Sequence, residues 1–264
     1  MKTTVARLTM VFVNLTFICL IFTLQSSTRI DPKTIVGMWL FDEGNGDTAK
    51  DFSRNGNDGK LMGSPKWVSG KFGKALEFNG VNDGVEISTP DNFNFLTWTY
   101  VLWFRSTMAG WPNLVGRQFP NTWGWTINLG GEDGTFRIRI DTDGGINQVK
   151  RVGGNVKDDQ WHHGAAVLDE KKKSVSLYVD AVNKLETTYV GNFKTGGGFL
   201  RIAAPAVGAT SLAGSIDDVG IFNQALAVDD IADIMKHGLE EALGLTAISP
   251  LGKLSTTWAS IKAQ

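Results

Sequence analysis

Three tryptophans close together in the sequence have the chemistry to hold a sugar. Trp111 lies in a Gly-Trp-Pro segment and Trp123 in a Thr-Trp-Gly segment, so both stand where the backbone turns. Trp125 follows two positions after Trp123, and on a strand these two side chains share a face. Because the C–H groups of a pyranose pack against an indole ring, the three tryptophans predict a carbohydrate-binding surface.

Planar polar side chains near these rings would take the sugar hydroxyls. Arg137, Arg139 and Asp141 alternate along one predicted strand and therefore share its polar face. Asp83 follows Asn82 in a predicted turn. Since guanidinium groups donate hydrogen bonds and carboxylates accept them, we expect Arg139, Asp141 and Asp83 to contribute to the same carbohydrate site.

Two further carboxylates are candidates for a structural calcium ion. Asp42 follows the first predicted strand and Asp217 lies in the last one, and these strands are neighbours in many sandwiches. Calcium prefers carboxylate and carbonyl oxygens supplied by loops. The alternative is that Asp42 forms a turn and Asp217 accepts a backbone hydrogen bond, and the sequence leaves both possibilities open.

The acidic and histidine residues do not form a recognisable catalytic set. A pair of catalytic carboxylates on one strand must be two or four residues apart, because only such residues project to the same side, and none of the acidic clusters has this spacing on a predicted strand. Remote carboxylates that converge in space remain an alternative. His162 and His163 are consecutive, so on a strand they diverge and do not predict a zinc site. We expect no enzyme activity.

The segments that position these residues read as short strands. Apolar and polar residues alternate from Ile35 to about Phe222, and turn signals such as Asn-Gly, Asp-Gly and Gly-Gly separate the runs. A helical period appears only late, in a short segment that Gly238 ends. We therefore expect an all-β, antiparallel two-sheet sandwich over residues 35–237, with one short C-terminal helix and an extension over residues 238–264.

The first 27 residues have the pattern of an export signal. Lys2 and Arg7 precede an apolar run from about Leu8 to Leu24, and small polar residues follow. An uncleaved membrane anchor is the alternative. Lys and Arg number 26 against 27 for Asp and Glu, and this lack of basic surplus argues against nucleic-acid binding. The sequence predicts a protein that is secreted or held in the cell envelope.

An ordered set of segments resembles the bacterial laminin G-like domains of the concanavalin A-like lectin/glucanase superfamily. The set spans residues 35–237, and each marker alone is a weak signal. The markers are Val-Gly-Met-Trp-Leu-Phe-Asp-Glu-Gly-Asn-Gly at 36–46, Gly-Lys-Phe-Gly-Lys-Ala-Leu-Glu-Phe-Asn-Gly-Val-Asn-Asp at 70–83, Asp-Gln-Trp-His-His at 159–163 and Gly-Ser-Ile-Asp-Asp-Val-Gly-Ile-Phe-Asn at 214–223. The sequence departs from the family pattern at Gly164, usually apolar, and at Ala227, usually a capping serine.

The resemblance implies a jelly roll and several possible functions, because lectins, glycosidases and adhesion modules share this fold. Related jelly rolls hold calcium with acids near Asp42 and Asp217. We expect an exported, non-catalytic binding or adhesion module of a bacterium whose partner is a glycan or a glycosylated surface. A glycoside hydrolase or polysaccharide lyase-like enzyme, and a structural module that contacts another protein, are the alternatives.

Overall fold

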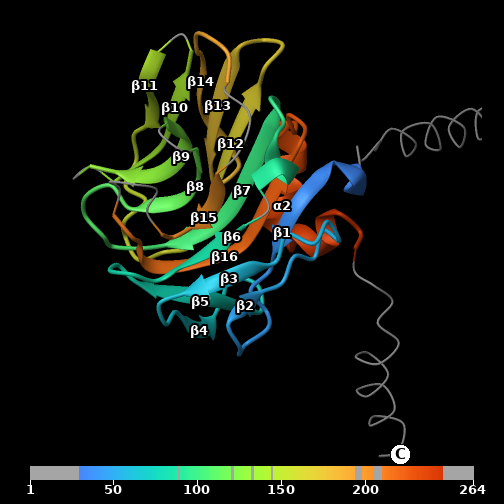
Figure 1. The fold of residues 1–264 in the computed structure, drawn as a ribbon, viewed down its shortest axis with the longest axis vertical. Helices are drawn as coiled ribbons and strands as arrows, with labels where there is room; N and C mark the ends of the chain where they lie inside the picture. Colours follow the sequence, from blue (N-terminus) through green and yellow to red (C-terminus); the bar gives the residue numbers. More distant parts are fainter. Residues whose placement is uncertain are drawn as a thin grey trace, which may run out of the picture.

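The computed structural model describes residues 30–88, 90–119, 122–131, 134–143, 145–193, 198–204 and 210–245. Within these residues, two antiparallel sheets of eight strands each form a sandwich, and a helix near the C-terminus lies on one flank (Figure 1). This architecture confirms the predicted all-β jelly-roll class. The described residues contain no helix that is long and apolar enough to cross a membrane.

Sheet A carries the first and last strands of the fold. Its order is β14 (Val182–Thr188), β13 (Ser174–Val179), β12 (His162–Asp169), β7 (Trp98–Arg105), β16 (Ala213–Phe222), β5 (Lys74–Asn79) and β4 (Lys66–Ser69), with β1 (Ile35–Trp39) also on β16. The long strand β16 pairs with β5 through its first half and with β1 through its second half. These pairings join distant parts of the chain in one sheet.

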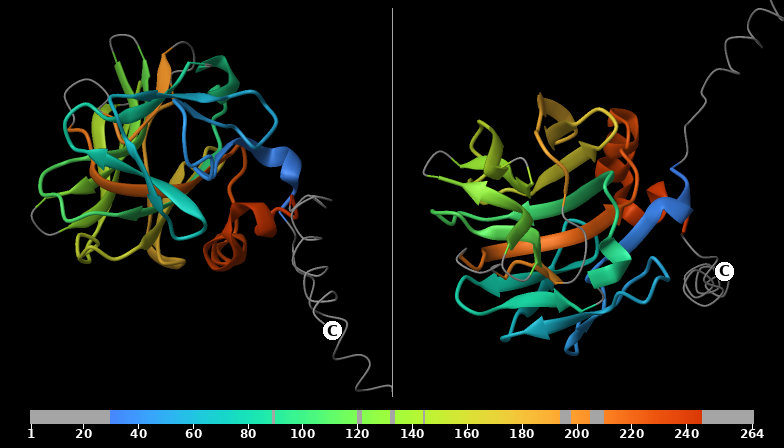
Figure 2. Two further views of the ribbon diagram at one scale, coloured as in Figure 1. Left: turned by 90° about the horizontal axis from the view of Figure 1, so that it is seen from below. Right: turned by 45° about the horizontal axis from the view of Figure 1, so that its top comes forward.

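Sheet B carries the predicted sugar-binding strands. Its order is β11 (Gly145–Val152), β10 (Thr135–Thr142), β9 (Thr122–Gly130), β8 (Asn113–Phe119), β15 (Phe199–Ile202), β6 (Gly84–Ile87), β3 (Gly59–Met62) and β2 (Thr48–Ala49). Two short 3₁₀ turns, η1 (Pro32–Thr34) and η2 (Pro90–Phe93), complete the connections. Figure 2 shows both sheets from two further directions.

The main core fills the space between the sheets and follows the alternation in the sequence. On β10, Phe136, Ile138 and Ile140 are fully buried, whereas Arg137 and Arg139 on the opposite face are partly exposed. The structure also explains Gly164, because a Cβ there would come within 2.7 Å of the Phe136 ring. The unusual glycine therefore leaves room for an aromatic pair between the sheets.

A second apolar cluster lies between sheet A and the helix α2 (Val228–Ala242). Ile231, Ile234 and Leu239 of α2 pack with Val101 of β7 and Phe222 of β16. Both views of Figure 2 place α2 on the same flank as β1. Gly238 interrupts the helix with a positive φ of 78°, as the sequence predicts, but the packed chain continues beyond it to Leu243.

The start of α2 also reflects an unusual residue. Ala227 has no side chain that could cap the helix, and the Asp230 carboxylate instead accepts a hydrogen bond from the Ala227 backbone N–H at 3.1 Å. This contact satisfies one amide at the helix N-terminus and places a negative charge in the first turn, where the helix dipole favours it. The structure therefore retains half of the usual capping arrangement.

Candidate functional site

Trp111 forms an open aromatic surface on sheet B, over one end of β9 and β10. It lies two residues before the start of β8, and it is 41% exposed. The ring lies against Gly130 of β9, where an added Cβ would come within 2.6 Å of it. The guanidinium carbon of Arg137 lies 4.0 Å from the ring centroid. The glycine permits this close approach, and the arginine supports the exposed ring through a cation–π contact.

Three arginines lie on the outer face of sheet B, and Arg137 is the one that contacts this ring. Arg137 and Arg139 come from β10, and Arg151 is the direct partner of Arg137 on β11. Burial, together with the positive charges of Arg139 and Arg151, lowers the pKa of Arg137 from its usual value. Asp141 forms an ion pair with Arg139 at 3.2 Å. Among these four described side chains, three positive charges lie beside one negative charge.

Arg137 also brings an unused hydrogen-bond donor to this surface. Its Nε atom is buried and has no hydrogen-bond partner among the described residues. A buried polar group without a partner costs free energy, which a ligand oxygen or a water molecule could recover. We call the surface formed by Trp111, Arg137, Arg139, Asp141 and Arg151 the Trp111 face.

Two polar residues of β9 continue the Trp111 face beneath these longer side chains. Thr126 is the cross-strand partner of Arg139, and Asn128 is the partner of Arg137. Thr126 donates a hydrogen bond to the Asn128 side chain at 2.9 Å, and both residues are buried. This bonded pair gives the face a polar floor, which the sequence analysis did not single out.

The structure separates Trp125 from Trp111. Trp125 is only 4% exposed and lies in the main core, with its ring centroid 4.3 Å from that of Tyr100 and 5.2 Å from that of Trp98. The prediction that Trp125 lies on the binding surface is therefore wrong, because the alternation of β9 turns this side chain inward. Trp123 belongs to β9, but its side chain lies outside the described residues.

Asp83 also belongs elsewhere. It is buried, and its two carboxylate oxygens accept hydrogen bonds from the backbone N–H groups of Ser64 at 2.8 Å and Asn79 at 3.0 Å. Its carboxylate holds two chain segments together at the end of β5. The structure does not bring Asp83 to the Trp111 face, so its predicted place in that site is corrected.

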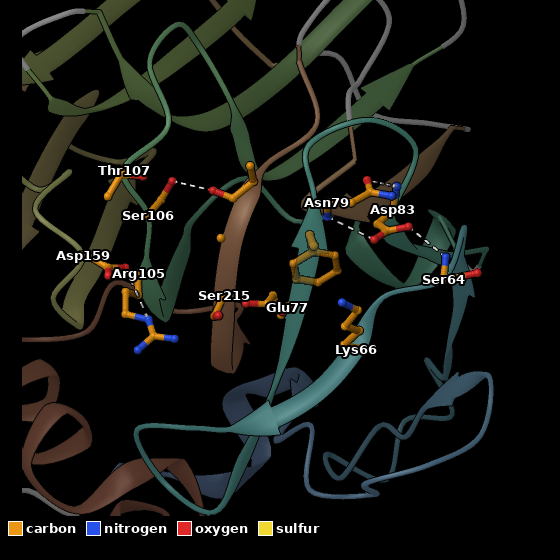
Figure 3. A pocket seen from close by; sticks show the side chains of 13 residues that line it. Ser64, Lys66, Glu77, Asn79, Asp83, Arg105, Ser106, Thr107, Asp159 and Ser215 are labelled. Carbon is orange, nitrogen blue, oxygen red and sulfur yellow. Dashed lines mark hydrogen bonds and ion pairs between the residues drawn. The ribbon is translucent and has the colours of Figure 1, made fainter.

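A polar pocket opens on sheet A, away from the Trp111 face. It has a volume of about 450 Å³, and Lys66, Glu77, Arg105, Asp159 and Ser215 are among the residues that line it (Figure 3). These residues come from β4, β5, β7, β16 and the loop before β12, so no local pattern in the sequence marks the pocket. We call it the Ser215 pocket.

Asp42 and Asp217 approach the same hairpin, residues 70–73 between β4 and β5. The Asp217 carboxylate accepts hydrogen bonds from the N–H groups of Lys71 at 2.8 Å and Phe72 at 3.0 Å, and Asp42 accepts one from Lys74 at 2.7 Å. The described residues contain no group of three or more acidic, histidine or cysteine side chains that could hold a metal. Both carboxylates therefore accept backbone hydrogen bonds, as in the alternative to a calcium site.

Asp217 and Asp218 are both buried, and burial dominates their chemistry. Desolvation and the neighbouring Asp218 charge raise the pKa of Asp217 to about 8, against the lowering effect of its backbone hydrogen bonds. Burial also raises the pKa of Asp218 to about 7, although the Leu239 N–H donates to its carboxylate at 3.1 Å. Neither side chain is open to a polymeric substrate, so the pair does not resemble a glycosidase site.

The two consecutive histidines have different environments, as the strand alternation predicts. His162 lies between Asp180 and Asp158, at 2.9 Å and 3.1 Å. His163 is buried 5.2 Å from the Trp103 ring, and burial lowers its pKa to about 4. His163 is therefore a neutral packing residue at ordinary pH, and the two rings do not converge on a metal.

Comparison with known protein families agrees with the fold. Residues 79–232 match the family described as the concanavalin A-like lectin/glucanases superfamily. Comparison with curated proteins finds no sequence that matches the chain.

Solved structures provide further matches, all at low sequence identity. One is domain 4 of AbnA, a GH43 extracellular arabinanase from Geobacillus stearothermophilus, in complex with arabinotriose: TM-score 0.63, 21% identity, 76% of this chain and 98% of that chain. Another is from a study of botulinum neurotoxin type C, whose cell entry depends on two ganglioside molecules. It matches with a TM-score of 0.63 and 12% identity, over 81% of this chain and 53% of that chain. A third is the Trypanosoma rangeli sialidase, with a TM-score of 0.60 and 17% identity, over 76% of this chain and 32% of that chain. The chain spans about half of the toxin structure and a third of the sialidase, and these likenesses show the fold alone.

Proposed function

The chain belongs to the concanavalin A-like lectin/glucanase superfamily, and from this premise we propose that it is a non-catalytic module that binds carbohydrate on the Trp111 face. The half-exposed Trp111 ring with Arg137 against it carries the proposal. A sugar ring would pack its C–H groups on the indole, and the neighbouring arginines would donate hydrogen bonds to its oxygens. The arabinotriose complex of the AbnA domain supports this assignment by analogy of fold.

The charges of the Trp111 face favour an acidic glycan. Arg139 has a carboxylate partner in Asp141, whereas burial, and then the positive charges of Arg139 and Arg151, lower the pKa of Arg137. A sugar carboxylate or sulfate would relieve this repulsion and accept charge-assisted hydrogen bonds. We therefore expect uronate, sialylated or sulfated glycans to bind more tightly than neutral ones, with an advantage that falls as salt rises.

The test is a glycan array that contains matched neutral and acidic oligosaccharides, probed with the wild-type domain and two variants. Trp111→Ala removes the stacking surface and is expected to weaken binding several-fold or more. Phe52→Ala is the matched control, because Phe52 is also 41% exposed but lies on the loop that contacts β1. If both variants bind as the wild type does, Trp111 is not part of the site.

Arg137→Gln separates the acidic-glycan proposal from simple stacking. It retains a polar side chain but removes the charge, so binding to acidic glycans should fall by about tenfold while binding to neutral ones changes little. Equal losses for both classes would contradict the preference for acidic glycans. Incubation with the bound oligosaccharide should release no shorter product, and cleavage would contradict the non-catalytic assignment.

We also propose that the domain acts outside the cell, on the basis of the apolar segment that precedes it. Removal of residues 1–27 would leave the described sandwich intact, because the first residue in its cores is Ile30. Mass spectrometry of secreted material should find a new N-terminus between about Leu24 and Arg29. Full-length chain in the membrane fraction would instead indicate an anchor.

A further inference from the structure

The Ser215 pocket is built across four neighbouring strands of sheet A. Lys66 on β4 pairs in register with Glu77 on β5, Glu77 with Ser215 on β16, and Ser215 with Arg105 on β7. Cross-strand partners lie on the same face, so these four side chains form one row. The small side chain of Ser215 between two long ones leaves the hollow between them.

The polar side chains of this row make few contacts with one another. Among the described residues, Lys66 and Glu77 form no ion pair with each other although they are direct cross-strand partners, and the Ser215 hydroxyl has no hydrogen-bond partner although the residue is buried. Figure 3 shows Glu77 directed toward Ser215 rather than Lys66. The only ionic contact of Arg105 in the described structure is a long one of 3.8 Å with Asp159.

Charges alternate along this row. Glu77 and Arg105 flank Ser215 directly, whereas Lys66 and Asp159 lie on the outer sides of the pocket. Asp83 also lines the pocket, but backbone N–H groups occupy its carboxylate. The inner walls are therefore negative on one side and positive on the other, with a free hydroxyl between them.

The lining does not resemble the stacking surface of the Trp111 face. Its one aromatic residue, Phe78, is buried in the main core and offers no open ring. The guanidinium carbon of Arg105 lies 5.4 Å from the centroid of the Trp161 ring, which is not part of the pocket lining. A ligand here would bind through charges and hydrogen bonds, because no aromatic platform is present in the pocket.

We propose that the Ser215 pocket binds a small zwitterion of dipeptide size, with the ligand ammonium at Glu77, its carboxylate at Arg105 and a peptide group at the Ser215 hydroxyl. Two strand spacings separate the Cα atoms of Glu77 and Arg105 by about 10 Å. An extended dipeptide spans about 7 Å, which is of the same scale as this spacing, and the flexible side chains of Glu77 and Arg105 set the distance between the two charged groups. The volume of about 450 Å³ accommodates such a ligand.

The test is calorimetric titration with dialanine, N-acetyl-dialanine and dialanine amide as probes. The wild type should bind dialanine, and loss of either ligand charge should weaken binding on the order of tenfold. Glu77→Gln should weaken dialanine binding by a similar factor, and N-acetylation should then cause no further loss. Arg105→Gln should show the same coupling with the C-terminal amide.

The control is Glu186→Gln, which changes an exposed glutamate on β14 of the same sheet and should leave binding unchanged. Thermal melting of each variant verifies that it is folded. Absence of dialanine binding, or equal binding of the blocked probes, would overturn the proposal. Glu77-dependent binding of neutral sugars in place of dialanine would also overturn it and make the pocket a glycan subsite.

The two proposals fail separately. Trp111→Ala should not affect dialanine binding, and Glu77→Gln should not affect the glycan array, because the two sites lie on different sheets. A result in which one variant abolished both activities would indicate a folding defect, which the melting curves would reveal.

Discussion

Sheet B contains two tryptophan–arginine arrangements with opposite consequences. Trp125 on β9 is buried against Tyr100, and its cross-strand partner Arg117 is buried with it. Trp111 at the edge of β8 is exposed and has Arg137 against its ring. The same two residue types therefore make a structural core in one place and an open surface in the other.

The side of the sheet determines this difference. Arg117 faces the core, donates hydrogen bonds to the Phe93 carbonyl and the Asn94 side chain, and has its pKa lowered by burial. Arg137 faces outward, where its guanidinium group lies against the exposed Trp111 ring. A charged residue beside an aromatic ring thus indicates a binding surface only when its strand position turns it away from the core.

The largest expected effect separates the two tryptophans by stability. Trp125→Ala should lower the free energy of unfolding by about 3–5 kcal/mol, because it leaves a cavity beside Trp98 and Tyr100. Trp111→Ala should lower it by less than about 1 kcal/mol. Urea denaturation of both variants measures this difference, and similar losses would show that Trp111 is a core residue.

The next largest effect should separate Arg117 from Arg137 by their contributions to the free energy of unfolding. Arg117→Met should lower the free energy of unfolding by about 2 kcal/mol, because it leaves the buried Phe93 carbonyl without this donor. Arg137→Met should change stability by less than about 0.5 kcal/mol and weaken acidic-glycan binding. The comparison would not hold if Arg137→Met destabilised the fold as much as Arg117→Met did.

The buried carboxyl groups of Asp217 and Asp218 should make the free energy of unfolding depend on pH. Between pH 6.5 and 8.5, Asp217 and Asp218 lose protons in the folded state. Carboxyl groups of the unfolded chain are already ionised in this range. His163 is neutral in the folded state throughout it. The folded state therefore binds more protons at the lower pH, and stability should fall on the order of 1 kcal/mol as pH rises.

Asp218→Asn should reduce this fall, because one of the two titrating groups is gone. Asp47→Asn, at an exposed position, should retain the wild-type pH dependence. Urea denaturation at both pH values provides the measurement. A wild-type stability that rises over this range would contradict the buried, protonated state of the pair.

The smallest expected effect concerns calcium. Because backbone N–H groups occupy Asp42 and Asp217 at the 70–73 hairpin, a chelator should leave the melting temperature unchanged. Wild type and Asp217→Asn should also respond identically to added calcium. A fall of the melting temperature with chelator that Asp217→Asn abolishes would restore the metal hypothesis.

Local patterns predicted much of the fold and part of the Trp111 face. Alternation assigned Phe136, Ile138 and Ile140 to the core and the arginines of β10 to the opposite face. The glycine and proline beside Trp111 predicted its exposure. Trp125 was misjudged because spacing shows which residues share a face but not which face meets the other sheet.

Contacts between distant segments lay beyond sequence reasoning. Arg151 joins the Trp111 face through the β10–β11 register, and the Ser215 pocket depends on a row that crosses β4, β5, β16 and β7. Asp83 looked like a surface turn residue, yet its carboxylate joins two backbone segments. These roles depend on strand order, which alternation and turn signals do not specify.

The pairing of β1 with β16 determines how the domain would respond to mechanical force. Ile35 at the start of β1 pairs with Phe222 at the end of β16, so the two ends of the sandwich leave from the same edge of this ladder. Tension applied between residues 30 and 245 would pull α2 from sheet A and then open the β1–β16 hydrogen bonds one after another from Ile35 onward. Because such peeling loads one bond at a time, the domain should yield at low force when stretched through its ends.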